Sequence, residues 1–438
     1  MKVTARCRVR LMGKGNAATN PHAGRGFFSA ILLALAALAM WAGAASGAEP
    51  RTVVIGFTAS QTGSLNVEGI RQINGVSLWV DDVNAAGGIP LADGTKVKVA
   101  AKFYDDESNK SRVQELYTKL ISGDKADFLI SPYSSGLTDA AAVIAEQKNK
   151  IMITAGAASD STYKKGFTLV YQTYTPASRY LTGAVDLLMK TWPGARKLAI
   201  VNEKDKFSAD VVAELKKYAE SKGFQIVMFE GYDTGTADFA PFINKIPADA
   251  DAIMGGGHFS DTSTFARQLY EKSSRAKMVA LLVAPPEPGF AELGKAAAGV
   301  IGSSQWEPAA RYSKENAKGV EWYGPGVADF EAGYQAKFHE EPSYHSAGGY
   351  AAGLLLEKAI RNCGSTDTGK VKAALDAMDI MTFYGRLSFV VAPASHGLQK
   401  GHEMIYIQWQ RDAGGSLVKQ LVWPEDTATA GVIPMPKR

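Results

Sequence analysis

Few residues in this 438-residue chain have the types and spacing of a catalytic centre. Gly255-Gly256-Gly257-His258 lacks the third glycine of a dinucleotide-binding loop, and no phosphate loop ending in Gly-Lys-Ser/Thr occurs. His339-Glu340 and His402-Glu403 begin like zinc-protease helices, but both lack the second histidine of that motif. No Gly-x-Ser-x-Gly sequence is present, so no motif supports a secreted serine hydrolase. The sequence therefore predicts no enzyme, no metal site and no cofactor.

A serine-rich segment, residues 131–138, is the first candidate for ligand binding. It leaves a predicted strand and enters a predicted helix, so backbone N–H groups and hydroxyls converge where an anion could sit. Ser134 and Ser135 would donate hydrogen bonds to a carboxylate there, and the field at the start of the helix would favour its charge. Ordinary N-capping of the helix by either serine explains the same residues equally well.

A second candidate follows the next predicted strand, Ile151–Ile153, which runs into small residues. Small side chains at Gly156, Ala157 and Ala158 would let a ligand approach the backbone closely. A helix-capping turn is an equally good interpretation of this segment.

The predicted elements that position these two loops alternate between strand and helix. Continuous apolar runs such as Val53–Phe57, each followed by an amphipathic helix, occur over residues 51–172 and again over 197–283. This alternation predicts an α/β fold with two parallel sheets. Ligands of such sheets bind beyond the carboxyl ends of the strands. The end of the chain differs, because residues 384–391, 404–409 and 417–423 are predicted to form antiparallel strands.

Charge separates the first 48 residues from the rest. They contain six Lys and Arg and no Asp or Glu, so they carry +6, and because the whole chain carries +4 the remainder carries −2. An apolar run, Phe27–Trp41, and small residues up to Ala48 follow the basic stretch. This order predicts a signal peptide cleaved after Ala48, with an uncleaved membrane anchor as the alternative. The exported chain would keep Cys363 as its single cysteine, and its charge argues against nucleic acid as a partner.

Short motifs along residues 51–425 together resemble one protein family. They are Val54-Ile55-Gly56, Gln61-Thr62-Gly63-Ser64, Val83-Asn84-Ala85-Ala86-Gly87-Gly88-Ile89, Tyr104-Asp105-Asp106, the Ser134-Ser135 loop, Thr154-Ala155-Gly156-Ala157, Pro342-Ser343-Tyr344, Ala351-Ala352-Gly353 and Thr382-Phe383-Tyr384-Gly385. On these motifs the chain resembles the leucine/isoleucine/valine-binding family of periplasmic solute-binding proteins, the type I proteins that serve ABC importers. The Asn-x-x-Gly-Gly-Ile element is the most specific of them.

The resemblance implies two doubly wound α/β lobes that close on a ligand, joined by three crossovers. The crossovers are expected near Thr173, Ser303 and residues 390–402. After the signal peptide of residues 1–48, the expected first lobe comprises residues 49–172 and 304–390. The expected second lobe comprises residues 173–303 and 391–438.

The resemblance also implies a binding site shared by the two lobes. Its expected ligand-binding residues are Ser134, Ser135, Gly156, Ala157, Ala158, Phe207, His258 and Glu287. Those of the first lobe would hold an amino acid's α-carboxylate. Phe207 and His258 would form a wall from the second lobe, and the carboxylate of Glu287 would hold the ammonium group. For His258 a position on the rim or hinge, and for Glu287 an exposed loop position, remain alternatives.

Two departures from the family pattern bear on the ligand. Ala158 stands where the family commonly has a threonine, and His258 stands where it often has a tyrosine. These differences indicate a ligand other than leucine, such as a polar or aromatic acid. The expected function is the periplasmic component of an ABC importer that captures a small carboxylate ligand, with amino acids as the leading class. We expect a monomer whose partner is a permease in the inner membrane. A binding protein for aromatic or other organic acids and a ligand sensor for a membrane receptor are the alternatives.

Overall fold

The computed structural model describes residues 51–310 and 312–436. The predicted signal peptide lies outside these residues. Within them, no helix has the length and apolar character needed to cross a membrane.

A six-stranded sheet forms first, in the order β2-β3-β1-β4-β5-β6. Its strands are β1 (Thr52–Ala59), β2 (Ile89–Pro90), β3 (Lys96–Asp105), β4 (Phe128–Ile130), β5 (Met152–Thr154) and β6 (Val170–Gln172). All neighbours are parallel except the edge pair β2–β3. Helices α2 (Asn66–Ala85), α3 (Lys110–Ser122), α4 (Ser135–Gln147) and α5 (Asp160–Tyr163) connect the strands. The continuous apolar run in β1 is buried, as expected of a strand covered on both faces.

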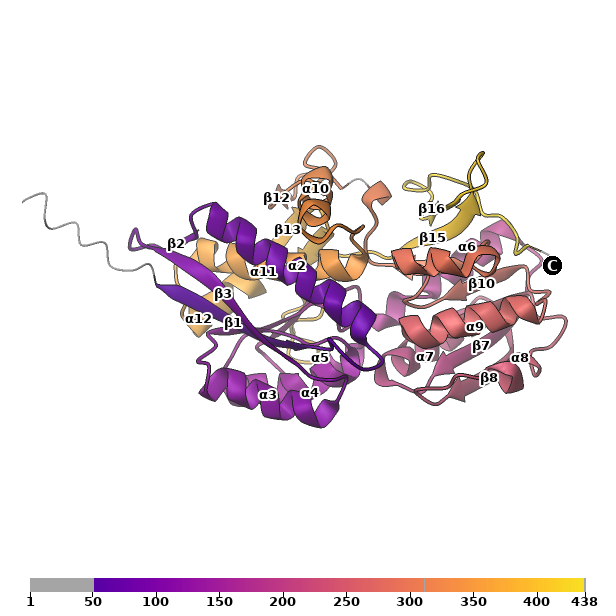
Figure 1. Ribbon diagram of the computed structural model, residues 1–438, viewed down its shortest axis with the longest axis horizontal. Coiled ribbons are helices and arrows are strands. Elements are labelled where there is room, and N and C mark those ends of the chain that lie inside the picture. Colours follow the sequence, from indigo (N-terminus) through magenta and orange to yellow (C-terminus); the bar gives the residue numbers. More distant parts are fainter. Residues whose placement is uncertain (1–50, 311, 437–438) are drawn as a thin grey trace, which may run out of the picture. The chain divides into compact units, whose positions relative to one another are not determined.

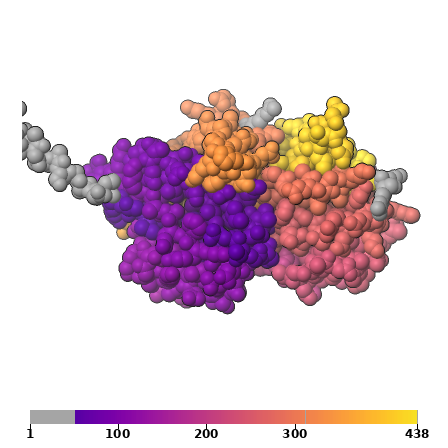
Figure 2. Space-filling view, in the orientation of Figure 1, coloured from indigo at the N-terminus to yellow at the C-terminus, as the bar shows by residue number. Residues whose placement is uncertain are grey.

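A second sheet of seven strands has the order β16-β15-β11-β10-β9-β7-β8. Its strands are β7 (Lys197–Glu203), β8 (Gln225–Tyr232), β9 (Ala252–Gly256), β10 (Met278–Leu281), β11 (Ile301–Ser304), β15 (Ile405–Arg411) and β16 (Leu417–Trp423). Five strands are parallel, and β15 and β16 add antiparallel pairs at one edge. Its helices are α6 (Thr182–Thr191), α7 (Lys206–Ser221), α8 (Ala240–Ile243) and α9 (Phe259–Glu271). Figure 2 shows the yellow residues of the C-terminal strands against salmon-coloured residues of this second part.

Three further helices belong with the first sheet. They are α10 (Val327–Phe338), α11 (Tyr344–Cys363) and α12 (Thr368–Asp376). The orange helix α11 lies along the indigo helix α2, although more than 250 residues separate them in the sequence (Figure 1). We call the first sheet with α2–α5 and α10–α12 the first lobe. The second sheet with α6–α9 is the second lobe.

The chain passes between the two sheets three times: between β6 and β7, after β11, and between β14 (Gly385–Ser388) and β15. The predicted α/β class with two doubly wound sheets is confirmed. The residue boundaries expected for the lobes stay a prediction. One expected strand is placed differently, because β14 pairs with β13 (Asp379–Thr382) in a small separate sheet with β12 (Glu321–Trp322), not with β15.

Both parallel sheets have the same strand order around their first strand. In the first sheet β3 lies on one side of β1 and β4 on the other, and in the second sheet β8 and β9 flank β7 in the same way. The connections therefore leave in opposite directions at β1/β4 and at β7/β9. Such switch points open a crevice at the carboxyl ends of the strands, where ligands of α/β proteins bind. The loops after β4, β7 and β9 carry Ser134, Asp205 and His258.

Candidate functional site

Ser134 and Ser135 stand at the start of α4, directly beyond β4. Ser134 is the N-cap residue of the helix, yet its side chain makes no capping hydrogen bond. The Ser135 hydroxyl accepts hydrogen bonds from the backbone N–H groups of Ala158 and Ser159, at 3.1 and 3.2 Å. Ser135 thus holds the loop that follows β5. The Ser134 hydroxyl stays available at the positive end of the helix.

The loop after β5 packs closely against its neighbours. A Cβ atom at Gly156 would lie 2.5 Å from Oε1 of Gln72 and 2.7 Å from Cδ2 of Tyr133, so glycine is required for this approach. The amide of Gln172 donates to the carbonyl oxygens of Ala157 and Ala158, at 3.3 and 3.0 Å. The loop is therefore fixed by the first lobe itself.

An inner cavity of about 10 Å³ lies between these loops and the second lobe. Its lining residues are Tyr133, Ser134, Ser135, Gly156, Ala158, Tyr174, Tyr180, Phe207, His258, Val283 and Tyr344. Aromatic rings dominate this wall, and the Phe207 and Tyr180 rings meet edge to face with centroids 5.0 Å apart. A volume of this size holds about one water molecule, so the two lobes are in a closed arrangement at this point.

A larger outer cavity of about 410 Å³ adjoins the same residues. Ser134 and His258 line both cavities. Side chains from both lobes surround the outer cavity, among them Asp139 and Lys110 of the first and Glu203 and Lys206 of the second. The outer cavity is thus surrounded mostly by polar and charged residues, and the small inner cavity mostly by aromatic ones.

His258 joins the two lobes at the wall between these cavities. Its Nδ1 lies 2.8 Å from the Tyr133 hydroxyl of the first lobe, and its Nε2 lies 3.3 Å from Oδ2 of Asp205. Burial alone would lower the pKa of His258. Asp205, Glu203 and Glu68 outweigh it and raise that pKa to about 10. His258 is therefore a cation in this arrangement at neutral pH.

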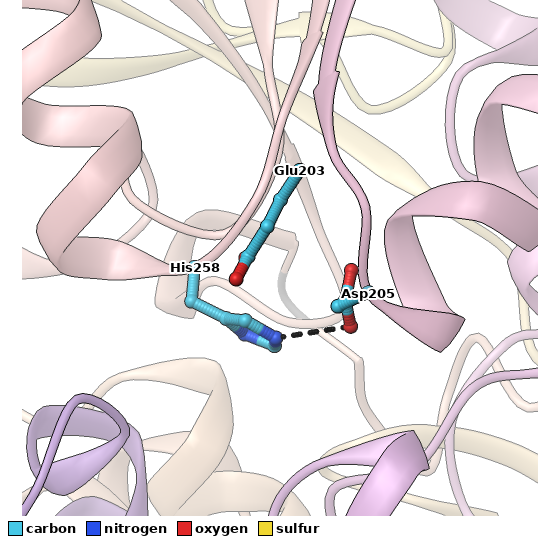
Figure 3. Close-up of side chains that lie close together, drawn as sticks. All are labelled: Glu203, Asp205 and His258. Atoms are coloured by element: carbon cyan, nitrogen blue, oxygen red, sulfur yellow. Dashed lines mark hydrogen bonds and ion pairs between the residues drawn. The ribbon is translucent and has the colours of Figure 1, made fainter. Parts of the chain in front are cut away.

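Glu203, Asp205 and His258 come together from three elements of the second lobe (Figure 3). Glu203 ends β7, Asp205 caps α7, and His258 precedes α9. One ligand atom from each lies within 4.8 Å of the others. Burial raises the pKa of Glu203 to about 6, although the charge of His258 opposes this shift. Burial also works to raise the pKa of Asp205, but the hydrogen bond and charge of His258 outweigh it and lower that pKa.

Buried carboxylates of each lobe contact the other. Oε1 of Glu68 in α2 accepts a hydrogen bond of 2.9 Å from the backbone N–H of Phe259, in the first turn of α9. Glu287, between β10 and β11, lies 2.5 Å from Nδ1 of His345 in α11 and 3.8 Å from Arg71. Burial alone would raise the pKa of Glu287, but His345 and Arg71 lower it, so its carboxylate is ionised. Both contacts depend on closed lobes.

The structure brings six of the eight predicted site residues to the inner cavity, and two lie elsewhere. Ala157 turns its carbonyl to Gln172, and Glu287 pairs with His345 and Arg71. Sequence reasoning missed four residues that the fold places at the same cleft: Glu68, Glu203, Asp205 and His345. Asp205 precedes Phe207 by two positions, so proximity to a predicted residue was the available signal for Asp205. For Glu68 and His345 the sequence carries no local signal, because each meets a partner distant in the chain.

A family model described as "Periplasmic binding protein" matches residues 52–415 of the chain. This chain belongs to the periplasmic binding protein family. The family comprises solute-binding proteins that bind small molecules and work with ABC transporter permeases. The predicted family and its role in solute transport are confirmed.

Two relatives illustrate the sequence similarity. The leucine-, isoleucine-, valine-, threonine- and alanine-binding protein of Pseudomonas aeruginosa is 24% identical over 369 residues, which cover 84% of this chain and 92% of the relative. A Leu/Ile/Val-binding protein homologue of Brucella melitensis is 25% identical over 385 residues, 84% of this chain and 90% of the relative.

Solved structures share the fold of this periplasmic binding protein. The branched-chain amino acid transporter substrate-binding protein of Streptococcus pneumoniae, solved with isoleucine, has a TM-score of 0.69 and 21% identity, covering 85% of this chain and 100% of the other. An ABC transporter solute-binding protein of R. palustris, solved with benzoate, has a TM-score of 0.67 and 20% identity, covering 85% and 98%.

Proposed function

We propose that this protein captures a small carboxylate ligand of the amino acid class in the periplasm and delivers it to an ABC permease in the inner membrane. Ser134 carries this proposal, because it is buried at the start of α4, lines the inner cavity, and makes no capping hydrogen bond with its hydroxyl. A carboxylate at this point would accept charge-assisted hydrogen bonds and would meet the favourable end of the helix dipole. Relatives named as Leu/Ile/Val-binding proteins support the ligand class.

Several finer features belong to the same proposal. The protein is exported with a signal peptide cleaved after Ala48, acts as a monomer, binds no nucleic acid and performs no chemistry on its ligand. The first lobe spans residues 49–172 and 304–390, and the second spans 173–303 and 391–438. A ligand sensor that reports to a membrane receptor would use the same site, and a test of uptake in a strain lacking the protein separates the two roles.

Ligand entry requires the lobes to separate. The inner cavity of about 10 Å³ is too small for an amino acid, and the contacts of Glu68 and Glu287 between the lobes must break to enlarge it. Binding then stabilises the closed state through contacts that exist only when both lobes touch the ligand.

A second candidate ligand class is an aromatic or other organic acid without an ammonium group. Glu287, the residue expected to bind an ammonium, is already paired with His345 and Arg71. Rings of Tyr133, Tyr174 and Phe207 line the cavity and would stack on an aromatic ligand. A solved relative with benzoate has the same fold.

A thermal-shift screen of the purified protein against amino acids, benzoates and short fatty acids tests the proposal. A true ligand at one hundred times its dissociation constant adds about 2.7 kcal/mol to the free energy of unfolding. The absence of stabilisation by every carboxylate in the screen, with a cooperative unfolding transition in each sample, would contradict the proposed ligand class.

Glu287→Gln separates the two candidates once a hit is found. If Glu287 holds an ammonium group, the substitution weakens the binding of amino acids and leaves the binding of aromatic acids unchanged. If Glu287 only joins the lobes through His345, the substitution weakens both classes by a similar factor. Isothermal titration with matched acids that differ in the amino group distinguishes these outcomes.

A further inference from the structure

The cluster of Glu203, Asp205 and His258 has the composition of a metal site. Carboxylate oxygen and imidazole nitrogen are both ligands of Zn²⁺ in proteins, and sites that keep an open position commonly use three protein ligands. The three residues stand at the switch point of the second sheet, where β7 and β9 send their chains in opposite directions. The fold therefore aims them at the crevice where a ligand would bind.

The spacing of two of the ligand atoms suits tetrahedral coordination. Nε2 of His258 and Oδ2 of Asp205 are 3.3 Å apart. Two ligands at the usual Zn–N and Zn–O distances on a tetrahedral ion are separated by about 3.3–3.4 Å. A carboxylate oxygen of Glu203 completes the set within 4.8 Å, and its side chain points toward the His258 ring in Figure 3.

Each side chain is held in place by hydrogen bonds that leave a lone pair for a metal. The backbone N–H of Phe207 donates to Oδ2 of Asp205 at 3.0 Å and that of Ser208 donates to Oδ1 at 2.8 Å, so Oδ2 keeps a second lone pair. The Thr234 hydroxyl donates to Oε1 of Glu203 at 2.5 Å. His258 uses Nδ1 to contact Tyr133, so Nε2 faces Asp205. A fixed orientation of this kind is what supporting hydrogen bonds provide around bound metals.

Oε2 of Glu203 supports a cation site independently of the spacing. Glu203 is only 3% exposed, and this oxygen has no hydrogen-bond partner among the described residues. A buried carboxylate oxygen without a donor carries a desolvation penalty that a cation would offset. A Cβ atom at Gly257 would overlap both this oxygen and Oδ2 of Asp261, which indicates that two carboxylates converge there.

The charges around the cluster also favour a divalent ion. The buried carboxylate of Glu68 lies 3.8 Å from Nδ1 of His258, and the half-buried carboxylate of Asp261 lies beside Oε2 of Glu203 around Gly257. A divalent cation at the cluster would offset the negative charge of these carboxylates.

We propose that Glu203, Asp205 and His258 bind one divalent transition-metal ion of the zinc type, whose remaining coordination position faces the 410 Å³ outer cavity. The three ligands belong to the second lobe alone, so the ion binds whether the lobes are open or closed. The Tyr133 contact to His258 then links the metal to the first lobe. Spacing rules could not find this site, because His258 lies more than 50 residues from its two partners.

Metal titration of the purified protein, stripped with EDTA and free of organic ligand, tests this inference. Isothermal titration with ZnCl₂ should show one ion per chain. Glu203→Gln and Asp205→Asn should each weaken the affinity for Zn²⁺ by roughly tenfold or more. Asparagine is also a good helix N-cap, so Asp205→Asn should preserve the start of α7. Asp139→Asn is the matched control, since Asp139 lines the same cavity but contacts Lys165 and Lys206. It should bind Zn²⁺ like the wild type.

Three results would overturn the proposal: no saturable site, equal loss of affinity in Asp139→Asn, or binding of Mg²⁺ and Ca²⁺ as tight as that of Zn²⁺. Co²⁺ offers a second measurement on the wild type in case the variants do not fold. One Co²⁺ per chain should give the intense visible absorption of a tetrahedral site, and the weak spectrum of an octahedral ion would contradict this assignment. Because no organic ligand is present, the outcome is independent of the proposed transport function.

Discussion

Adjacent serines at the start of α4 have different roles. The Ser135 hydroxyl accepts from two buried backbone N–H groups of the loop after β5, whereas Ser134 lines both cavities and its hydroxyl makes no capping hydrogen bond. The first is a structural interaction within the first lobe, and the second has the position of a ligand contact.

Ser134→Ala should therefore weaken binding of the carboxylate identified in the screen by ~1–3 kcal/mol, because one hydrogen bond to a charged group is lost. Its free energy of unfolding without ligand should stay close to that of the wild type. Ser135→Ala should instead lower that free energy by ~1–3 kcal/mol, since two buried donors lose their acceptor. Isothermal titration and urea unfolding measure the two quantities. Unchanged affinity in a folded Ser134→Ala protein would refute the carboxylate contact.

Ser134 could be predicted because its signal is local: a strand, a serine loop and a helix follow one another in the sequence. Glu287 was predicted as a ligand contact, but it lies outside the lining of the inner cavity and pairs with His345, which is far away in the chain. The cluster around His258 was missed for the same reason. Sequence reasoning identified residues near the switch points and could not identify which of them would pair.

Glycine residues of α11 allow α2 and α11 to approach each other closely. A Cβ atom at Gly349 would overlap the backbone oxygen of Gln72, and one at Gly353 would overlap the ring of Trp79. This close approach brings Arg71 of α2 and His345 of α11 to the same carboxylate, Glu287. The packing of two helices that are far apart in the sequence thus builds the contact between the lobes.

Gly349→Ala should destabilise the protein by ~1–3 kcal/mol or more, because the added methyl group meets backbone atoms that cannot rotate away. Gly333→Ala in α10 is the matched control. A Cβ there would lie 3.8 Å from Leu78, an ordinary contact, so alanine should be neutral or stabilising by about 0.5–1 kcal/mol. Urea unfolding of both variants tests this comparison. Equal stability of the two would show that α2 and α11 do not pack as closely as described.

At the level of elements, some strands were predicted with their bounds and others were missed. The bounds of β16 agree with the strand predicted over residues 417–423, which follows the turn at Gly414-Gly415. The three-residue strand β6 and helices α6 and α12 were not predicted. Strand β14 was expected beside β15, but a hydrogen-bonded partner depends on three-dimensional proximity that periodicity does not encode.

On the scale of the whole molecule, the three connections between the sheets meet in one hydrogen-bonded group. The backbone N–H of Thr175 donates to Oε1 of Gln305 at 2.9 Å, and its hydroxyl lies 2.8 Å from Nδ1 of His402. Nε2 of His402 lies 2.8 Å from the carbonyl oxygen of Tyr384, so Nε2 carries the proton and Nδ1 accepts from Thr175. A neutral imidazole thus joins the connections about which the lobes would move.

The stability of the protein should depend on the protonation of His402. Burial, aided by the charge of Arg179, lowers the pKa of His402 from 6.5 to about 4. Above pH 6.5 both states hold a neutral ring and the group has no effect. As the pH falls from 6.5 toward 4, the unfolded chain takes up a proton that the folded protein does not, so stability decreases. The loss between pH 7 and pH 4.5 should be about 2–3 kcal/mol.

His402→Gln should remove this part of the pH dependence, because glutamine can donate to Tyr384 and accept from Thr175 but does not titrate in this range. Urea unfolding of both proteins at several pH values gives the difference in their free energies. As the pH falls below 6.5, the free energy of unfolding of the wild type should decrease by more than that of the variant. Carboxylates such as Glu287 affect both proteins alike. A difference that stays constant down to pH 4.5 would mean that His402 becomes protonated without unfolding, and therefore that the connections are open to water.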